Sequence, residues 1–180
     1  MDHVLTTPEL RRSKLSRADF PALARTPITV VLDDVRGSYN LGAIVRLCDA
    51  FLCEQLVICG VPVAGRNRKF VQAAKGAQHW VPWREEPEAA AVVRAAKADG
   101  HWIGVVELTA ESVDVTAIEP RYPAVLVFGG ERSGVSRDVL ACADQAIHIP
   151  MLGLANSLNI ATACAIVLHE FRRHAAQGHP

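Results

Sequence analysis

The sequence predicts an α/β domain built on a mostly parallel sheet with helices on both faces. Short apolar runs rich in β-branched residues, such as residues 28–32 (ITVVL), alternate along the chain with segments of helical periodicity. Runs that are apolar throughout are typical of strands covered by helices on both sides. A length of 180 residues fits one domain whose core needs neither disulfides nor a metal.

Six segments carry the strand pattern. Each is short and mostly apolar, and turn-forming residues separate it from the next element. They are residues 28–32 (ITVVL), 55–59 (QLVIC), 79–83 (HWVPW), 101–108 (HWIGVVEL), 124–128 (AVLVF) and 146–150 (AIHIP).

Helical segments lie between these runs. The segment 87–99 is Ala-rich, starts with Pro87 and is followed by Gly100, which is the usual order of a helix start and stop. The last segment has basic residues near its C-terminus, where they suit the helix dipole. The five expected helices cover residues 41–51, 69–77, 87–99, 137–142 and 156–174.

The chain divides into three parts by composition. Residues 1–26 form a basic arm without clear periodicity, residues 27–174 the α/β domain, and residues 175–180 a tail. No apolar run reaches the roughly 18 residues of a membrane span, and the N-terminus lacks a signal-peptide core. The five cysteines form no Cys-x-x-Cys pair, so we expect a cytoplasmic protein with buried, reduced thiols and no membrane partner.

The formal net charge of zero hides an asymmetry. Residues 1–84 hold 12 Lys and Arg against 7 Asp and Glu, whereas residues 85–180 hold 7 against 12. Local clusters of this kind either attract phosphates or form an ordinary solvated surface. The basic residues concerned are Arg11, Arg12, Lys14, Arg66, Arg68 and Lys69.

Several common functional motifs are incomplete. Gly37 and Gly42 have P-loop spacing, but Ala and Ile follow where Lys and Ser/Thr are required. His169 and the next histidine do not share a helix face, so we expect no metal site. The Gly-Gly-x-x-x-Gly at 129–134 follows a strand, which leaves a dinucleotide-dependent enzyme as a minor alternative.

Three loops at expected strand ends combine glycine with polar side chains. They read NLGAIVR at 40–46, FGGERSGV at 128–135, and IPMLG at 149–153 followed by SLNI at 157–160. Glycine allows close approach of the backbone to a ligand, and the polar side chains supply hydrogen bonds. Parallel sheets bind ligands at the carboxyl ends of their strands, so these loops form the expected site.

These three segments resemble, in order, the motifs of the SpoU (TrmH-like) RNA 2′-O-ribose methyltransferases of the SPOUT superfamily. The first matches N-x-G-x-x-x-R, the second a strand ending in G-x-E-x-x-G, and the third I-P-M-x-G followed by S-L-N. The resemblance extends from about residue 28 to 171. Position 130 is Gly where many relatives have Asn.

The resemblance implies a deep trefoil knot formed by residues 124–170 and S-adenosylmethionine as the methyl donor, without a metal. It also implies a homodimer with the active site at the interface. Many relatives carry an N-terminal RNA-binding domain, for which 26 residues are too few, so target selection should rest on the domain, the arm, the dimer or a partner. The expected cofactor-binding residues are Leu108, Gly129, Gly130, Ile149, Met151, Gly153 and Leu158.

The resemblance further implies that Arg46 activates the ribose hydroxyl, with Asn40, Glu131, Ser157 and Asn159 around it. A guanidinium stays protonated at neutral pH, so Arg46 suits gripping a phosphate and stabilising an oxyanion better than accepting a proton. The expected substrate is RNA, with tRNA favoured over rRNA, and the six basic residues above are candidate RNA contacts. A catalytically inactive RNA-binding protein is the main alternative.

Overall fold

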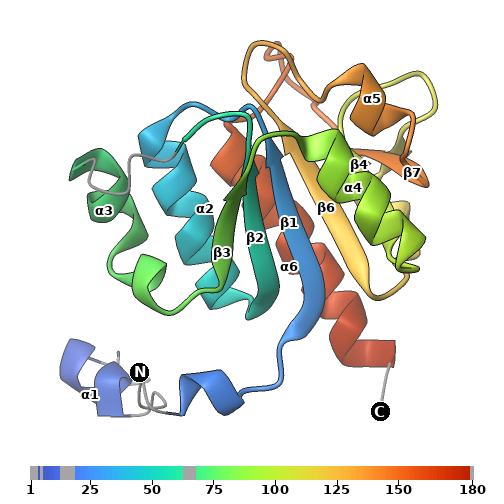
Figure 1. Ribbon diagram of the computed structural model, residues 1–180. Coiled ribbons are helices and arrows are strands. Elements are labelled where there is room, and N and C mark those ends of the chain that lie inside the picture. Colours follow the sequence, from blue (N-terminus) through green and yellow to red (C-terminus); the bar gives the residue numbers. More distant parts are fainter. Residues whose placement is uncertain (1–3, 5, 13–18, 63–67, 179–180) are drawn as a thin grey trace.

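The computed structural model describes residues 4, 6–12, 19–62 and 68–178, and a seven-stranded sheet forms its centre (Figure 1). The strands are β1 (Thr26–Asp33), β2 (Cys53–Cys59), β3 (Trp83–Glu86), β4 (Trp102–Val106), β5 (Val113–Asp114), β6 (Ala124–Gly129) and β7 (Gln145–His148). Their order is β3-β2-β1-β6-β4-β7-β5, and every pair among them runs parallel. The expected fold class is confirmed. The implied knot concerns the threading of the chain and stays a prediction.

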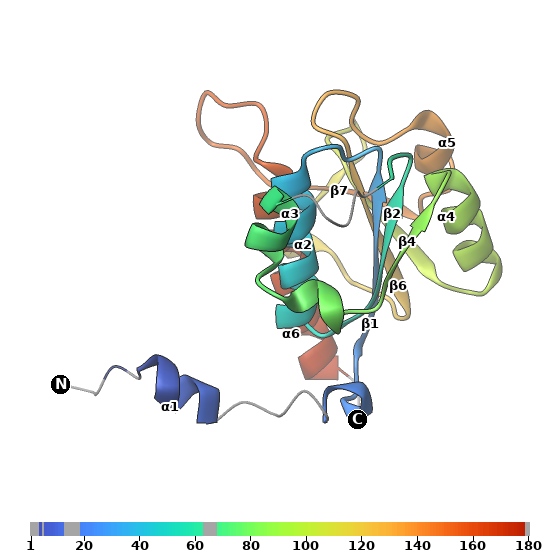
Figure 2. The ribbon, with the colours of Figure 1, turned by 60° about the vertical axis from the view of Figure 1, so that its left-hand side comes forward.

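Helices cover both faces of this sheet (Figure 2). One face carries α2 (Ser38–Ala50), α3 (Arg68–Ala74) and α6 (Ile160–Gly178), and the other carries α4 (Ala89–Ala98) and α5 (Arg137–Leu140). The segment before the sheet holds α1 (Thr7–Arg12) and the 3-10 turn η1 (Phe20–Ala22). Two further 3-10 turns are η2 (Ala77–His79) and η3 (Val115–Ala117).

The core consists of two apolar layers, one on each side of the sheet. Along β1, Val30 and Leu32 pack towards α2 and α6, whereas Val31 packs towards α4. In β6, residues 124–128 are all buried. Strands covered on both faces need apolar side chains at consecutive positions, which explains why these runs show no polar alternation.

The third strand was placed wrongly by the sequence pattern. Of residues 79–83, His79 ends the η2 turn, residues 80–82 are not in a strand, and only Trp83 belongs to β3. Val81 is buried, and the carbonyl of Pro82 accepts a hydrogen bond from the Leu56 N–H. Their apolarity therefore reflects burial in a turn rather than an extended backbone. The two-residue strand β5 is too short to produce a periodic signal.

Two helix starts also differ from the prediction. α4 begins at Ala89 with Glu88 as its N-cap, so Pro87 lies just outside the helix. The last helix begins at Ile160, four residues later than the start of the predicted range. Gly100 ends α4 as expected, with a left-handed φ of 84° that favours glycine.

Close packing of α2 against α3 depends on Gly42. A Cβ atom at this position would lie 2.3 Å from the carbonyl oxygen of Phe70 and 2.9 Å from the Cβ of Ala73. The glycine of the first motif therefore serves helix packing, and α3 is fixed beside the N-terminal half of α2.

The cysteines are all free thiols, as expected, and only Cys142 is not buried. Burial, together with the nearby carboxylates of Asp33 and Glu86, raises the pKa of Cys59 to about 12, so this thiol stays protonated at neutral pH. Within the described ranges, the helices are all too short or too polar to cross a membrane.

Candidate active site

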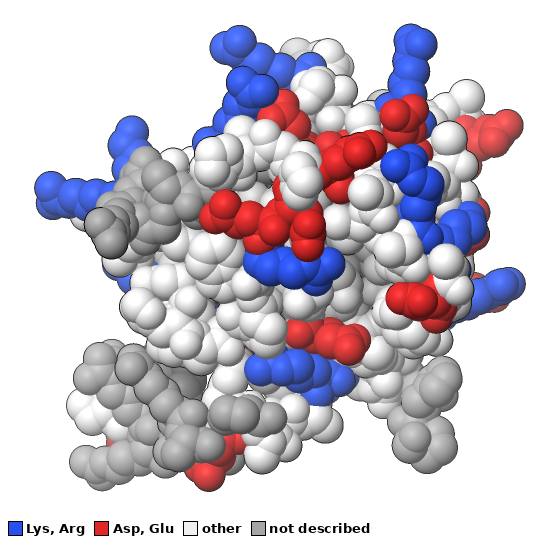
Figure 3. All heavy atoms as spheres, viewed as in Figure 1, with Lys and Arg blue, Asp and Glu red and all other residues white. Residues whose placement is uncertain are grey.

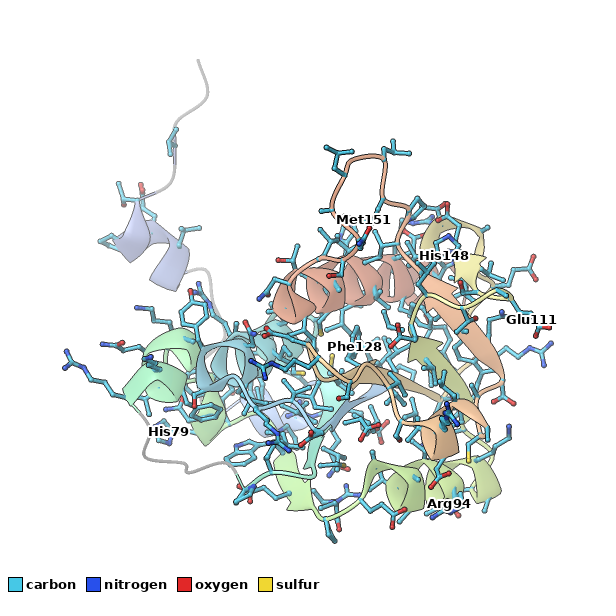
Figure 4. The ribbon with its side chains drawn as sticks, turned by 90° about the horizontal axis from the view of Figure 1, so that it is seen from above. His79, Arg94, Glu111, Phe128, His148 and Met151 are labelled. Carbon is cyan, nitrogen blue, oxygen red and sulfur yellow. The ribbon has the colours of Figure 1, made fainter. Side chains whose placement is uncertain are left out.

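The loops that follow β1, β4, β6 and β7 meet at the carboxyl edge of the sheet, because these strands are neighbours and parallel. They surround a cavity of about 870 Å³. Figure 4 looks down on this edge, with Phe128 near its centre and Met151 at the base of the projecting loop that precedes α6. The cavity is lined by residues from 106–109, 128–137, 147–151 and 156–163.

A chain of amide and carboxylate hydrogen bonds joins the three sequence motifs. Asn40, in the first turn of α2, is only 9% exposed. Its Nδ2 donates to Oε1 of Glu131, and its Oδ1 accepts from Nδ2 of Asn159 at 3.0 Å. Asn40 lies 91 residues from Glu131 and 119 residues from Asn159 in the chain, and its buried amide connects them.

Asn159 also caps the last helix. Its Oδ1 accepts hydrogen bonds from the backbone N–H groups of Ala161 at 2.9 Å and Thr162 at 3.4 Å. These N–H groups have no partner within the helix, so a side-chain acceptor stabilises the helix start. The same amide therefore sets both the first residue of α6 and the orientation of Asn40.

The glycines of the second motif are required by the packing of their own loop. A Cβ atom on Gly129 would lie 2.1 Å from the carbonyl carbon of Gly134, and one on Gly130 would lie 2.7 Å from the backbone oxygen of Asp34. Gly134 has a left-handed φ of 62°. The loop thus folds tightly over the end of β6, and only glycine fits at these positions.

Most of the expected cofactor residues line the cavity. Leu108 is 69% exposed and Leu158 37% exposed, which places two apolar side chains in contact with the solvent at its wall. Gly153 lies outside the described lining, and a Cβ atom there would meet nothing within 4 Å. The expected residues in the lining are Leu108, Gly129, Gly130, Ile149, Met151 and Leu158.

The five expected catalytic residues do not all meet within one chain. Glu131, Ser157 and Asn159 line the cavity, and Asn40 contacts two of them. Arg46 is exposed on α2 and lies outside the cavity lining. It follows Asn40 by six residues, which turns it to another side of the helix.

Of the expected RNA contacts, the structure describes two side chains. Arg68 and Lys69 are exposed at the start of α3. Figure 3 shows basic side chains standing out at the left edge, where α3 lies in Figure 1. Arg11 and Arg12 end α1. Their side chains, like the whole of Lys14 and Arg66, lie outside what the structure describes.

Sequence reasoning missed three polar residues at this edge. Asp33 ends β1 and Glu107 directly follows β4, and each carboxylate accepts a backbone N–H from the loop after β6. His148 lines the cavity, and its buried Nδ1 has no hydrogen-bond partner among the described residues. The sequence signal for each was a polar residue at or directly after the end of a strand.

Among the described residues near this edge, one carboxylate has a shifted pKa, and it lies on β5. Asp114 pairs in register with His148 and accepts hydrogen bonds from the backbone N–H and the hydroxyl of Thr116. These bonds, with a smaller contribution from His148, lower the pKa of Asp114. Among the described residues, no group of three or more His, Cys, Asp and Glu side chains could hold a metal ion.

Comparison with known proteins decides the family. The profile of the SpoU rRNA methylase family matches residues 27–169. The chain belongs to this family. The match covers both the network around Asn40 and the cavity, so the expected family is confirmed.

Relatives of this SpoU-family chain have similar sequences and structures. It is 36% identical over 146 residues to a tRNA (guanosine(18)-2'-O)-methyltransferase of Thermus thermophilus, covering 81% of this chain and 74% of that protein. It is 30% identical to the 23S rRNA (guanosine-2'-O-)-methyltransferase RlmB of Neisseria meningitidis, over 84% of this chain and 60% of that protein. A crystal structure of the A. aeolicus TrmH/SpoU tRNA modifying enzyme superposes with a TM-score of 0.76 at 32% identity, covering 85% and 78% of the two chains.

A ligand-bound structure is also similar. The AdoMet-bound rRNA methyltransferase from Sinorhizobium meliloti superposes with a TM-score of 0.77 at 32% identity. The match covers 84% of this SpoU-family chain and 57% of the Sinorhizobium meliloti protein.

Replacing Asn159 should separate its two roles. Asn159→Ala removes the cap of α6, which contributes about 1 kcal/mol, and leaves Oδ1 of Asn40 without its donor, which costs about 1–3 kcal/mol more, so the free energy of unfolding should fall by about 2–4 kcal/mol. Asn159→Asp keeps the cap acceptor and loses only the donor to Asn40, so its loss should be smaller. Urea denaturation measures both, with Asn156→Ala, an exposed neighbour on the same loop, as the control. An Asp variant as unstable as the Ala variant would contradict the capping role.

Proposed function

We propose that this protein transfers a methyl group from S-adenosylmethionine to a ribose 2′-hydroxyl of RNA, with tRNA favoured over rRNA. The observation that carries the proposal is the Asn40 network, which joins the three motif loops beside one cavity. The names of the relatives support the reaction. The first six similar sequences, which come from Thermus thermophilus, Escherichia coli, Shigella flexneri and Aquifex aeolicus, are all named tRNA (guanosine(18)-2'-O)-methyltransferases. The AdoMet-bound relative supports the methyl donor.

The residues present at the cavity fit S-adenosylmethionine. A volume of about 870 Å³ lies within the roughly 300–1,000 Å³ of small-molecule sites. Leu108, Ile149 and Leu158 offer apolar contact to a purine ring, and Gly129 leaves backbone groups at the cavity wall.

S-adenosylmethionine supplies a methyl group that is already activated on a sulfonium, so the protein must align the hydroxyl and manage one proton. In the transfer, the methyl group would pass to the 2′-oxygen, sulfur would keep the electron pair of the broken bond in S-adenosylhomocysteine, and the hydroxyl proton would pass to the solvent. Asn40 and Asn159 fix the carboxylate of Glu131 at the rim of the cavity. Arg46, which stays charged, stabilises the developing oxyanion and the adjacent phosphate.

Arg46 performs this role from a second copy of the chain. It is exposed and lies outside the cavity of its own chain, whereas the other four expected catalytic residues lie in or next to it. A homodimer that brings α2 of one copy to the cavity of the other would complete each site. This arrangement agrees with the dimeric active site implied by the family resemblance.

The basic start of α3 contacts the RNA backbone. Arg68 and Lys69 are exposed, and α3 packs against α2 through Gly42, close to Asn40. Phosphate contacts position an RNA without reading its sequence. The 2′-hydroxyl is the group that distinguishes RNA from DNA at such a site.

Ligand binding tests the assignment of the cavity. S-adenosylmethionine at 100 times its dissociation constant should stabilise the protein by about 2.7 kcal/mol and raise the melting temperature, whereas NAD should not. Labelled methyl groups should then appear on ribose in tRNA. Stabilisation by NAD alone would favour a dinucleotide-dependent enzyme. Cofactor binding with no transfer to any cellular RNA would favour an inactive RNA-binding protein.

Mixing variants tests the shared site. Arg46→Ala should abolish transfer while calorimetry shows unchanged affinity for S-adenosylmethionine, and Glu131→Ala should also abolish transfer. When the two variants are mixed in equal amounts, unfolded and refolded together, half of the dimers contain one copy of each variant. Each of these dimers has one intact site, so the mixture should recover about a quarter of the wild-type activity. A mixture as inactive as either variant would place Arg46 in the site of its own chain.

Salt dependence tests the RNA contact of α3. Arg68→Ala with Lys69→Ala should weaken RNA binding at low salt and reduce the slope of log affinity against log salt by about one to two. The double variant Arg94→Ala with Arg121→Ala, which removes two exposed charges remote from α2, is the matched control. Equal slopes in wild type and the α3 variant would remove this surface from the proposal.

A further inference from the structure

Two carboxylates hold neighbouring amides of the loop that follows β6. The strands β1 and β4 flank β6 on either side. Oδ2 of Asp33, at the end of β1, accepts the N–H of Ser136 at 2.8 Å. Oε2 of Glu107, directly after β4, accepts the N–H of Val135 at 3.0 Å. The loop is thereby fastened to the sheet on both sides of the strand from which it emerges.

We propose that Glu107 is a positioning residue that holds the 129–135 loop in the shape that binds the cofactor. The inference rests on the proposed function and adds to it a residue that lies outside all three sequence motifs. Glu107 and Leu108 both line the cavity, as do all residues of that loop. A shift of the loop would therefore change the cavity wall directly.

Glu107 connects three walls of the cavity. Its Oε1 accepts the N–H of Leu108 at 3.1 Å, while Oε2 binds the loop after β6. Its own backbone N–H donates to the carbonyl of Ile147 on β7 at 3.0 Å. One residue thus links the end of β4 to the loop on one side and to β7 on the other.

The loop is shaped around this carboxylate. A Cβ atom on Gly134 would lie 2.4 Å from Oε2 of Glu107, so the side chain packs against the backbone there. The N–H of Gly134 donates to the carbonyl of Gly130 at 2.9 Å, which closes the loop into a tight turn. The turn carries Glu131, whose carboxylate contacts Asn40. Holding Val135 therefore also fixes the position of Glu131.

A carboxylate is the only side chain of this size that accepts at both ends. Gln at position 107 would keep the length but turn an N–H₂ group towards one of the two N–H donors. A hydrogen bond to a charged group would be lost and a donor left unpaired. Loss of that bond should weaken cofactor binding without touching the RNA contacts of α3.

The test compares Glu107→Gln with wild type in the full chain. Calorimetry should show about tenfold weaker binding of both S-adenosylmethionine and S-adenosylhomocysteine, because a misplaced loop affects both ligands alike. In the transfer assay KM for S-adenosylmethionine should rise by a similar factor, while RNA affinity stays unchanged. The control is Glu111→Gln, which removes an exposed carboxylate from the loop between β4 and β5, the loop that also carries Glu107. It should change none of these values.

Three outcomes would overturn the proposal. Unchanged affinity for both ligands would show that the loop does not need Glu107. Weaker binding of the sulfonium ligand alone would assign Glu107 to direct charge attraction instead. If Glu107→Gln does not fold, Glu107→Asp takes its place, because it keeps the charge but withdraws the carboxylate oxygen from the N–H of Val135. This variant should show the same tenfold loss of affinity. Wild-type affinity in Glu107→Asp would also overturn the proposal. Failure of the wild type to bind S-adenosylmethionine contradicts the proposed function, not this inference alone.

Discussion

The placement of β6 between β1 and β4 is the constraint on which the candidate site depends. These strands are distant in the sequence, yet their registers match Asp33 with Gly129 and Val106 with Phe128. Because parallel strands end at the same edge, three loops start level with one another. Glu107 and Asp33 can therefore reach consecutive amides of a single loop. A slip of one residue in either register would turn these side chains to the opposite face of the sheet.

The strand register brings the starts of the loops together, and the buried amide of Asn40 then joins the loops to one another by hydrogen bonds. It donates to the carboxylate of Glu131 and accepts from the amide of Asn159, so both of its ends are used. Aspartate would present a second negative charge to Glu131 and could not donate. An apolar residue would leave polar partners unsatisfied, which costs about 1–3 kcal/mol for each buried group. Asparagine satisfies both neighbours, which explains why the first motif begins with a residue that can both donate and accept a hydrogen bond.

The sequence allowed prediction of the fold class and of the loops that form the site, because consecutive apolar residues indicate buried parallel strands and such strands place their ligands at one edge. It did not reveal the roles of individual glycines. Gly42 and Gly129 serve close packing within the protein, which depends on contacts between distant segments. Glu107 was missed because an acidic residue at the end of a strand is common. Only the register identifies the amide that it binds.

Several carboxylates lie at the carboxyl edge of the sheet, where they would repel a polyanion such as RNA. The groups that fasten the loop are engaged by backbone N–H donors, and Asp34 pairs with Arg36 at 3.1 Å. Glu131 accepts from Asn40. Much of the negative charge at the edge is thus engaged in local hydrogen bonds and one ion pair, and Arg68 and Lys69 at the start of α3 are exposed to the solvent. In a chain of zero net charge, attraction of a polyanion depends on such a local basic surface, and the approach that this surface favours runs over α3 towards Asn40.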